Sequence, residues 1–161
     1  MAPNSALTLA AHALCWMELA RRRGEPILSS YRIAASLASH PVAVRRLLGQ
    51  LREAGLVEAT RGRGSGWALS RPAEDITLLD VHDALGHDAP FALHAHEPNL
   101  ECPVGFGIRP VLADVYERVD SAISNELRGL TIVDVLDDLL RRRQRSAARH
   151  RPGPGPCRVP G

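Results

Sequence analysis

The fold is decided by residues 40–69, HPVAVRRLLGQLREAGLVEATRGRGSGWAL. Pro41 opens a predicted helix, because a residue without an N–H group costs nothing at the first helical position. Gly55 ends this helix, and two predicted strands follow at 56–60 and 67–70. The glycines of the turn between the strands supply the positive φ angles that a tight hairpin needs. Helix, strand, basic turn and strand in this order predict a winged helix.

The predicted helix has an apolar face and a cationic face. Helical spacing gives an inward row of Val44, Leu47, Leu48 and Leu51 and an outward row of Arg45, Arg46 and Arg52. In a winged helix the first turns of this helix meet base edges in the major groove, where Arg can bond guanine through two hydrogen bonds. The basic hairpin lies against the phosphates. We therefore expect DNA contacts from His40, Pro41, Val42, Arg45, Arg46, Arg61 and Arg63.

Each of these contacts has a plainer alternative. Arg45 and Arg46 could form only a solvated face, and the wing could be an ordinary hairpin that happens to be basic. For His40, a phosphate contact and a role as helix cap are equally open. The order of helix, glycine, strand and wing favours DNA contact.

Charge is distributed along the chain in three blocks. Residues 1–76 carry ten Arg and six acidic residues (net +4), residues 77–140 three Arg and twelve acidic residues (net −9), and residues 141–161 seven Arg and no acidic residue (net +7). A basic block beside an acidic one suits a nucleic-acid module attached to a part that must avoid DNA. We therefore predict a winged-helix DNA-binding domain at 1–76, a linker, sensor loop and dimerisation helices at 77–140, and a disordered Arg/Pro-rich tail at 141–161.

Source and compartment follow from composition. All 20 basic residues are Arg, which is typical of a G+C-rich genome and indicates a bacterial protein. The N-terminus lacks a cationic leader, and no apolar stretch is long enough to span a bilayer. We therefore expect a cytoplasmic protein without membrane contact, in which the three cysteines are thiols.

Further helices are predicted on both sides of the winged segment. The first covers residues 5–22, with Ser5 as its cap, Gly24 as its stop and Cys15 as a small buried hydrophobe. A second is capped by Ser29 or Ser30, and others cover 77–85 and 132–140, capped by Thr77 and Thr131. Short strands are possible at 26–28 and 91–94. The fold class is therefore mainly α, with a small β component.

A long amphipathic helix is predicted before the last one. Its apolar residues recur at spacings near three and four: Ile108, Leu112, Val115, Val119, Ile123 and Leu127. Five or six turns are too many for the small winged core to cover. The stripe therefore predicts a partner helix, most simply the same helix of a second subunit.

Five segments together make a recognisable pattern: LTLAAHAL (7–14), HPVAVRRLLGQLREAGLV (40–57), RGRGSGWAL (61–69), ITLLDVHDALG (76–86) and ECPVG (101–105). With the long helix that follows, residues 5–140 resemble the Rrf2 (Rrf-two) family of bacterial winged-helix regulators. This family includes an iron–sulfur cluster regulator, a nitric-oxide-sensing repressor and a cysteine-metabolism repressor. The resemblance implies a homodimer that binds a palindromic operator, usually as a repressor.

The loop before the long helix departs from the cluster-bearing members. Those members place three cysteines there, whereas this chain has only Cys102. No iron–sulfur cluster or other cofactor is therefore expected, and the chain is nearer to members with a lone cysteine. Cys102 is the candidate redox sensor, but Glu101 and Pro103 do not lower a thiol pKa, so a structural role is the alternative.

A metal site in the same loop is the weaker alternative. His94, His96, Glu97 and Cys102 include ligand types that suit zinc or iron. No close pair of cysteines accompanies them, so we predict no metal.

These observations favour a homodimeric repressor of a palindromic operator, tuned by a small signal or by thiol redox state. The alternatives are a winged-helix protein-interaction module and a metal-responsive regulator. An enzyme is not expected, because no Ser/His/Asp or carboxylate arrangement lies in a catalytic context.

Overall fold

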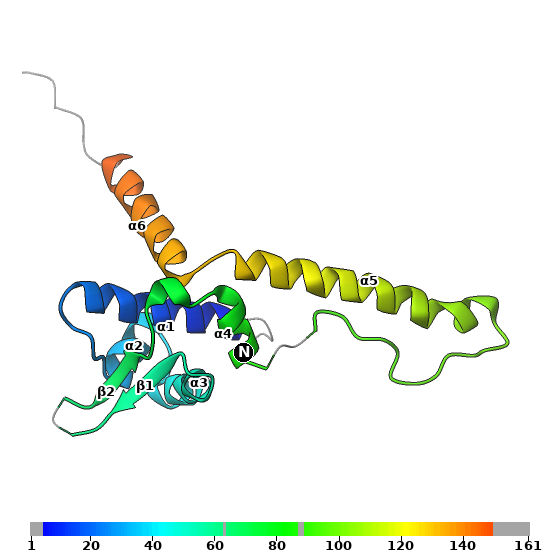
Figure 1. Ribbon diagram of the computed structural model, residues 1–161, viewed down its shortest axis with the longest axis horizontal. Coiled ribbons are helices and arrows are strands. Elements are labelled where there is room, and N and C mark those ends of the chain that lie inside the picture. Colours follow the sequence, from blue (N-terminus) through cyan, green and yellow to red (C-terminus); the bar gives the residue numbers. More distant parts are fainter. Residues whose placement is uncertain (1–4, 63, 87–88, 150–161) are drawn as a thin grey trace, which may run out of the picture.

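The computed structural model describes residues 5–62, 64–86 and 89–149 (Figure 1). Its elements in chain order are α1 (Ser5–Arg22), α2 (Ser30–Leu37), α3 (Pro41–Glu53), β1 (Val57–Thr60), β2 (Gly66–Leu69), the 3-10 turn η1 (Ala73–Asp75), α4 (Leu78–Ala84), α5 (Pro103–Arg128) and α6 (Ile132–Arg149). The chain is mainly helical with one two-stranded sheet, so the predicted winged helix-turn-helix and long helix are confirmed.

A compact head is built around α1. This helix packs against α2, α3, α4, β2 and the start of α6. The core contains the fully buried side chains of Leu14, Met17, Leu48 and Leu51. Cys15 lies in the same core, as predicted. The head therefore holds α3 and the wing on one rigid base.

A third backbone segment, residues 26–28, lies beside the two strands of the wing; it was predicted only as a possible strand. β1 and β2 pair antiparallel, with Val57 opposite Leu69 and Thr60 opposite Gly66. Residues 26–28 form no strand, but Leu28 makes one isolated bridge to Trp67, with N–O distances of 2.8 and 3.0 Å. The root of the wing is thereby fixed to the segment between α1 and α2.

The last helix belongs to the head. Ile132 and Leu136 are buried in the core, and the Ile132 N–H donates to the Ile76 carbonyl at 2.9 Å. The prediction that this helix ends at Leu140 was wrong, since α6 continues to Arg149. Arg is a strong helix former, and Asp138 accepts from Arg142 one turn later at 2.6 Å. The rest of the predicted tail, 150–161, lies outside the described residues.

Matching caps start the two helices that flank α5. The Thr77 hydroxyl caps α4 and Asp80 reaches back to the Thr77 N–H, while Thr131 and Asp134 do the same for α6. This is the Thr-x-x-Asp form of the capping box. The two helices start side by side, because Thr77 and Thr131 form a bridge.

α5 projects from the head, as Figure 1 shows. Its 26 residues correspond to about 39 Å at 1.5 Å per residue. It begins at Pro103 rather than near Ile108, and none of its residues is fully buried. Residues 91–94 are not a strand, so that expectation was wrong. This segment runs outward from the head along α5, and Phe91 stacks on Tyr116 with ring centroids 5.2 Å apart (Figure 1). Within the described part of the chain, no helix is both long enough and apolar enough to cross a bilayer.

Candidate nucleic-acid interface

α2 and α3 are joined by a turn of three residues. The Ser29 side chain caps α2 by accepting from the Arg32 N–H at 3.3 Å. Ala38 ends α2 in the left-handed region with φ 48°, and the Ser39 N–H donates to the Ala34 carbonyl at 3.0 Å. This six-to-one bond closes the helix as a Schellman motif does. The short turn makes α2 and α3 a helix-turn-helix.

His40 is the cap of α3. Its Nδ1 accepts from the Val42 N–H at 3.2 Å, and Pro41 takes the first helical position. Because Nδ1 accepts, the ring proton in this geometry is on Nε2. The capping role that the sequence left open is therefore present, and the exposed ring leaves a phosphate contact as a prediction.

α3 has the two faces that its sequence predicts. Val44, Leu47, Leu48 and Leu51 are buried, whereas Arg45, Arg46 and Arg52 are exposed and Val42 is 57% exposed. Among the described residues, neither Arg45 nor Arg46 has a carboxylate partner within salt-bridge distance. Two unneutralised guanidinium groups near a helix N-terminus form a cationic surface suited to phosphates or guanine edges.

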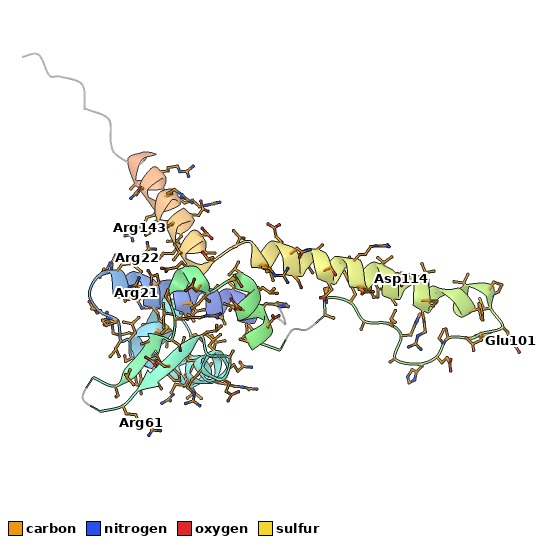
Figure 2. The ribbon with its side chains drawn as sticks, in the orientation of Figure 1. Arg21, Arg22, Arg61, Glu101, Asp114 and Arg143 are labelled. Atoms are coloured by element: carbon orange, nitrogen blue, oxygen red, sulfur yellow. The ribbon has the colours of Figure 1, made fainter. Side chains whose placement is uncertain are left out.

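The wing turn is closed by polar contacts and glycines. Thr60 Oγ1 accepts from the Gly66 N–H at 3.0 Å, and Gly62 and Gly64 have φ angles of +94° and +81°. Those angles favour glycine over any residue with a Cβ. Arg61 is exposed at this turn and is labelled in Figure 2, whereas Arg63 lies outside the described residues.

α3 and the wing share one side of the head. Figure 1 shows them on the side opposite to the exits of α5 and α6. The helix that contains Arg45 and Arg46 and the wing turn that contains Arg61 therefore lie on the same side of the head, as docking to a duplex requires.

An apolar groove beside α3 was missed from the sequence. It has a volume of about 570 Å³, and its lining includes Leu9, Leu37, Val42 and Leu47. The small side chains of Ala6 and Ala43 also line this space, together with Arg46 and His40. The exposed Val42 on a polar face was the one signal in the sequence that could have indicated it.

Cys102 is at the start of α5, which the sequence reasoning did not anticipate. It is the N-cap residue, exposed, and its pKa is lowered by the backbone N–H groups of Gly105 and Val104. Glu101 and Pro103 were expected to give no help, and the help comes instead from the first turn of α5, which begins directly after Cys102 rather than a few residues later. Pro103, read as an unhelpful neighbour, was the signal of a helix start.

Cys15 has the opposite environment. Burial raises the pKa of its thiol to about 11, and the negative charge of Glu18 adds to this effect. A thiolate is the reactive form of cysteine, and these pKa shifts favour it at the exposed Cys102 and disfavour it at the buried Cys15.

The described residues offer no metal centre. They contain no group of three or more His, Cys, Asp or Glu side chains that could hold an ion. His94 and His96 are both exposed. Iron–sulfur clusters are held by several cysteine thiolates, and Cys102 is the one exposed cysteine in the described part of the chain.

The apolar stripe of α5 is only half covered. The residues predicted for dimerisation are all partly buried: Ile108, Leu112, Val115, Val119 and Ile123. Val104 and Phe106, in the first turn of α5, and Val111 are 60–72% exposed. A soluble monomer seldom leaves several large apolar residues of one helix this exposed.

Comparison with known proteins identifies relatives over nearly the whole described chain. The family model Rrf2, described as an iron-dependent transcriptional regulator, matches residues 4–138. YwnA of Bacillus subtilis, named as an HTH-type transcriptional regulator, is 34% identical over 137 residues, which cover 84% of this chain and 98% of YwnA.

Solved structures show the same fold. A crystal structure described as that of a DNA-binding protein has 31% identity and a TM-score of 0.64, covering 82% of this chain and 99% of its own. The global cysteine regulator CymR of B. subtilis has 26% identity and a TM-score of 0.58, with 81% and 94% covered. These relatives are transcriptional regulators, which are not enzymes.

Proposed function

The chain belongs to the Rrf2 family of DNA-binding transcriptional regulators, and on that basis we propose that it is a homodimeric repressor of a palindromic operator. α3 reads the major groove, and the wing holds the backbone beside it. The observation that carries this proposal is the pair Arg45 and Arg46, which are exposed and unneutralised near the N-terminus of α3. This helix lies on the same side of the head as the wing turn with Arg61. Among the described residues, neither of these two guanidinium groups has a carboxylate within salt-bridge distance, and a phosphate or base of DNA would supply the missing partner.

Dimerisation through α5 supplies the two-fold symmetry. The half-covered stripe of α5 matches the same stripe of a second copy, and pairing would also cover Val111. Two heads related by this axis would read two half-sites about one helical turn, roughly 34 Å, apart.

Selection of bound fragments from genomic DNA tests the operator proposal. The expected result is one enriched sequence with inverted half-sites, protected from hydroxyl radicals on both halves. A promoter reporter then distinguishes repression from activation. Enrichment of a single half-site, or of no sequence at low salt, would contradict the proposal and favour a protein-interaction module.

The signal is proposed to act through Cys102 rather than through iron. An exposed thiol at a helix N-terminus ionises readily, and the connecting segment that contains it contacts α5 through Phe91 and Tyr116. Oxidation there could change how the two heads are spaced. Oxidant-induced release from the operator should be lost in Cys102→Ser; unchanged release would exclude Cys102.

The donor set does not fit a resident iron–sulfur cluster. The family description mentions iron, but Cys102 has no second cysteine in its segment. We therefore expect protein purified without oxygen to be colourless and to bind the operator after chelation. If the purified protein absorbs visible light, and chelation removes both this absorption and operator binding, the metal-responsive alternative is restored.

A further inference from the structure

A second cationic surface lies away from α3. It is formed by the C-terminal ends of α1 and α6 and is called here the α1/α6 surface: Arg21, Arg22, Arg23, Arg141, Arg142, Arg143 and Arg145. All seven residues are exposed, and Figure 2 shows Arg21, Arg22 and Arg143 on the same part of the head. The wing turn with Arg61 lies on the opposite side of the head.

A buried carboxylate and an ion pair hold this surface together. Glu18 is 1% exposed and accepts from Arg21 Nε at 2.7 Å and from Arg22 Nε at 2.8 Å. Arg22 Nη1 also donates to Asp137 Oδ1 of α6 at 2.7 Å. The C-terminal end of α1 is thereby fixed against the N-terminal half of α6.

The acidic residues of this surface do not neutralise it. The surface has seven arginines and five nearby carboxylates, which leaves a net charge of +2; the carboxylates are Glu18, Glu74, Asp134, Asp137 and Asp138. Asp138 pairs with Arg142 at 2.6 Å and with Arg141 at 3.8 Å. Arg145 has no carboxylate partner within salt-bridge distance among the described residues.

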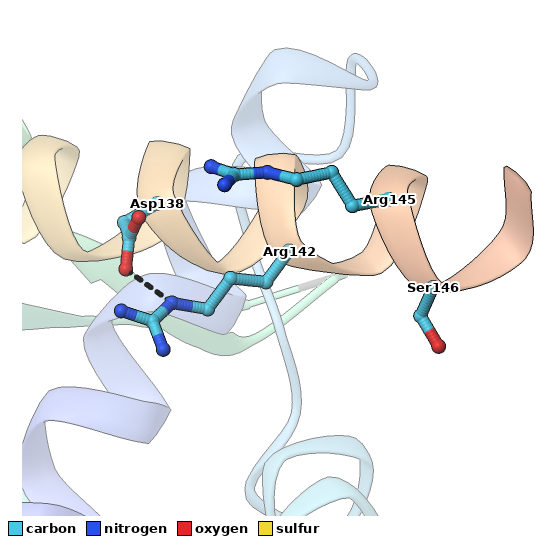
Figure 3. Close-up of a pocket in the computed structure, with 4 residues that line it drawn as sticks. All are labelled: Asp138, Arg142, Arg145 and Ser146. Carbon is cyan, nitrogen blue, oxygen red and sulfur yellow. Dashed lines mark hydrogen bonds and ion pairs between the residues drawn. The ribbon is translucent and has the colours of Figure 1, made fainter. Parts of the chain in front are cut away.

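Two of the arginines border a shallow pocket. Arg142 and Arg145 line a space of about 410 Å³ together with Asp138 and Ser146 (Figure 3). Both guanidinium groups extend toward the Asp138 end of this pocket, and a guanidinium group matches the oxygens of a phosphate group. Beyond this pocket the helix is uncovered, since residues 141–147 are all exposed.

The arrangement of the arginines identifies the kind of partner. Arg141, Arg142 and Arg143 are consecutive, so their side chains point around the helix at about 100° intervals rather than along one stripe. A carboxylate or one acidic helix would meet a single stripe. The phosphates of a duplex form a broad, regular array of charge that such a helix end can meet without reading bases.

From this geometry we propose that the α1/α6 surface binds the backbone of duplex DNA without sequence preference. It faces away from α3, so a straight duplex held by α3 does not reach it. The duplex that it binds is therefore a second segment, and the protein bridges two segments of DNA. The bridging rests on the proposed operator binding by α3, whereas the duplex binding of the α1/α6 surface does not.

The test uses the full chain on an immobilised operator. Beads carry the selected operator duplex and the protein, and a fluorescent duplex without that sequence is added. Capture of the fluorescent duplex and the amount of protein on the beads are both measured. We expect capture at 50 mM salt and, with about four phosphate contacts at a slope of −0.9 each, roughly a tenfold loss on doubling the salt.

A charge variant and a matched control decide the outcome. The variant replaces Arg142, Arg143 and Arg145 by Gln, and the control removes the same number of charges from α5 by replacing Arg109, Arg118 and Arg128 by Gln. The variant should remain bound to the operator beads but capture at least tenfold less fluorescent duplex than the wild type. The control should capture as much as the wild type. Equal capture by variant and wild type overturns the proposal.

Other outcomes are also distinguishable. Protein absent from the operator beads indicates failure of the α3 proposal, and free protein is then tested directly for salt-dependent duplex binding. Binding of poly-glutamate with no capture of duplex at any salt would assign the surface to an acidic protein partner and overturn the DNA proposal.

Discussion

Replacing Glu18 by Gln tests how the head holds α1 and α6 together. The carboxylate is 1% exposed and accepts three hydrogen bonds, from Arg21 at 2.7 and 3.0 Å and from Arg22 at 2.8 Å. Gln keeps the shape and one acceptor oxygen, but it loses the charge and turns an NH2 group toward the arginines.

The expected loss is about 2 kcal/mol in the free energy of unfolding at pH 7. Removing one partner of a fully buried ion pair costs about 3–5 kcal/mol. The cost is smaller here because the side chains of Arg21 and Arg22 are 52% and 34% exposed and can be hydrated again. For a chain of this size the loss corresponds to a Tm lower by about 4–8 °C.

The pH dependence gives a second, independent readout. Hydrogen bonds from Arg21 hold the pKa of Glu18 below its ordinary value of 4.5. A depressed folded-state pKa gives stabilisation that is complete above the unfolded value and is lost as pH falls through the folded value. The gap between wild type and Glu18→Gln should therefore close as pH falls below 4.5.

Urea unfolding followed by circular dichroism measures both effects. Glu25→Gln is the matched control, because the Glu25–Arg32 pair is as short, at 2.6 Å, but both side chains are about half exposed. It should cost less than about 0.5 kcal/mol. Equal losses in the two variants, or a gap for Glu18→Gln that does not change with pH, would refute the reasoning.

Three further perturbations follow from the structure. Gly66→Ala should lower the free energy of unfolding in urea by about 1–3 kcal/mol, because the added Cβ would lie 2.7 Å from the Leu28 backbone oxygen. Gly49→Ala in α3, where the added Cβ has no atom within 4 Å, should instead raise the free energy of unfolding by up to about 1 kcal/mol. A change of the same sign in both variants would show that the contact with Leu28 does not determine the cost at Gly66. In a Cys157→Ser background, iodoacetamide should label Cys102 in the native protein and Cys15 only in denaturant, because burial raises the pKa of Cys15 to about 11 while backbone N–H groups lower that of Cys102; rapid native labelling of Cys15 would contradict this. Val119→Asp should give a monomer in sedimentation equilibrium, since it buries a charge in the proposed α5 interface, whereas the exposed Glu117→Gln should not; a dimer in both would move the interface away from this stripe.

The recognition helix and wing could be predicted because their signals are local. Four apolar residues at helical spacing, with Pro41 before them and Gly55 after them, determine which face of α3 is buried. The same holds for the caps at Thr77 and Thr131.

The errors came from local signals that were misjudged and from one long-range contact. The arginine run after Leu140 has no apolar period, but Arg is a strong helix former and Arg142 pairs with Asp138 one turn earlier, so its helical signal was local and was overlooked. The close approach of Leu28 to Gly66 joins distant segments and leaves no local pattern. Pro103 was visible, but it was not recognised as the first residue of α5.

The central claim is tested most directly by the affinity of an α3 variant for the selected operator. Arg45→Ala with Arg46→Ala should weaken operator binding at least about 30-fold, because each contact of an arginine with guanine contributes roughly 1–3 kcal/mol. The matched control, Arg118→Ala with Arg128→Ala on α5, should bind within about twofold of wild type, and both variants should sediment as the wild type does. Wild-type affinity in the α3 variant would contradict the account.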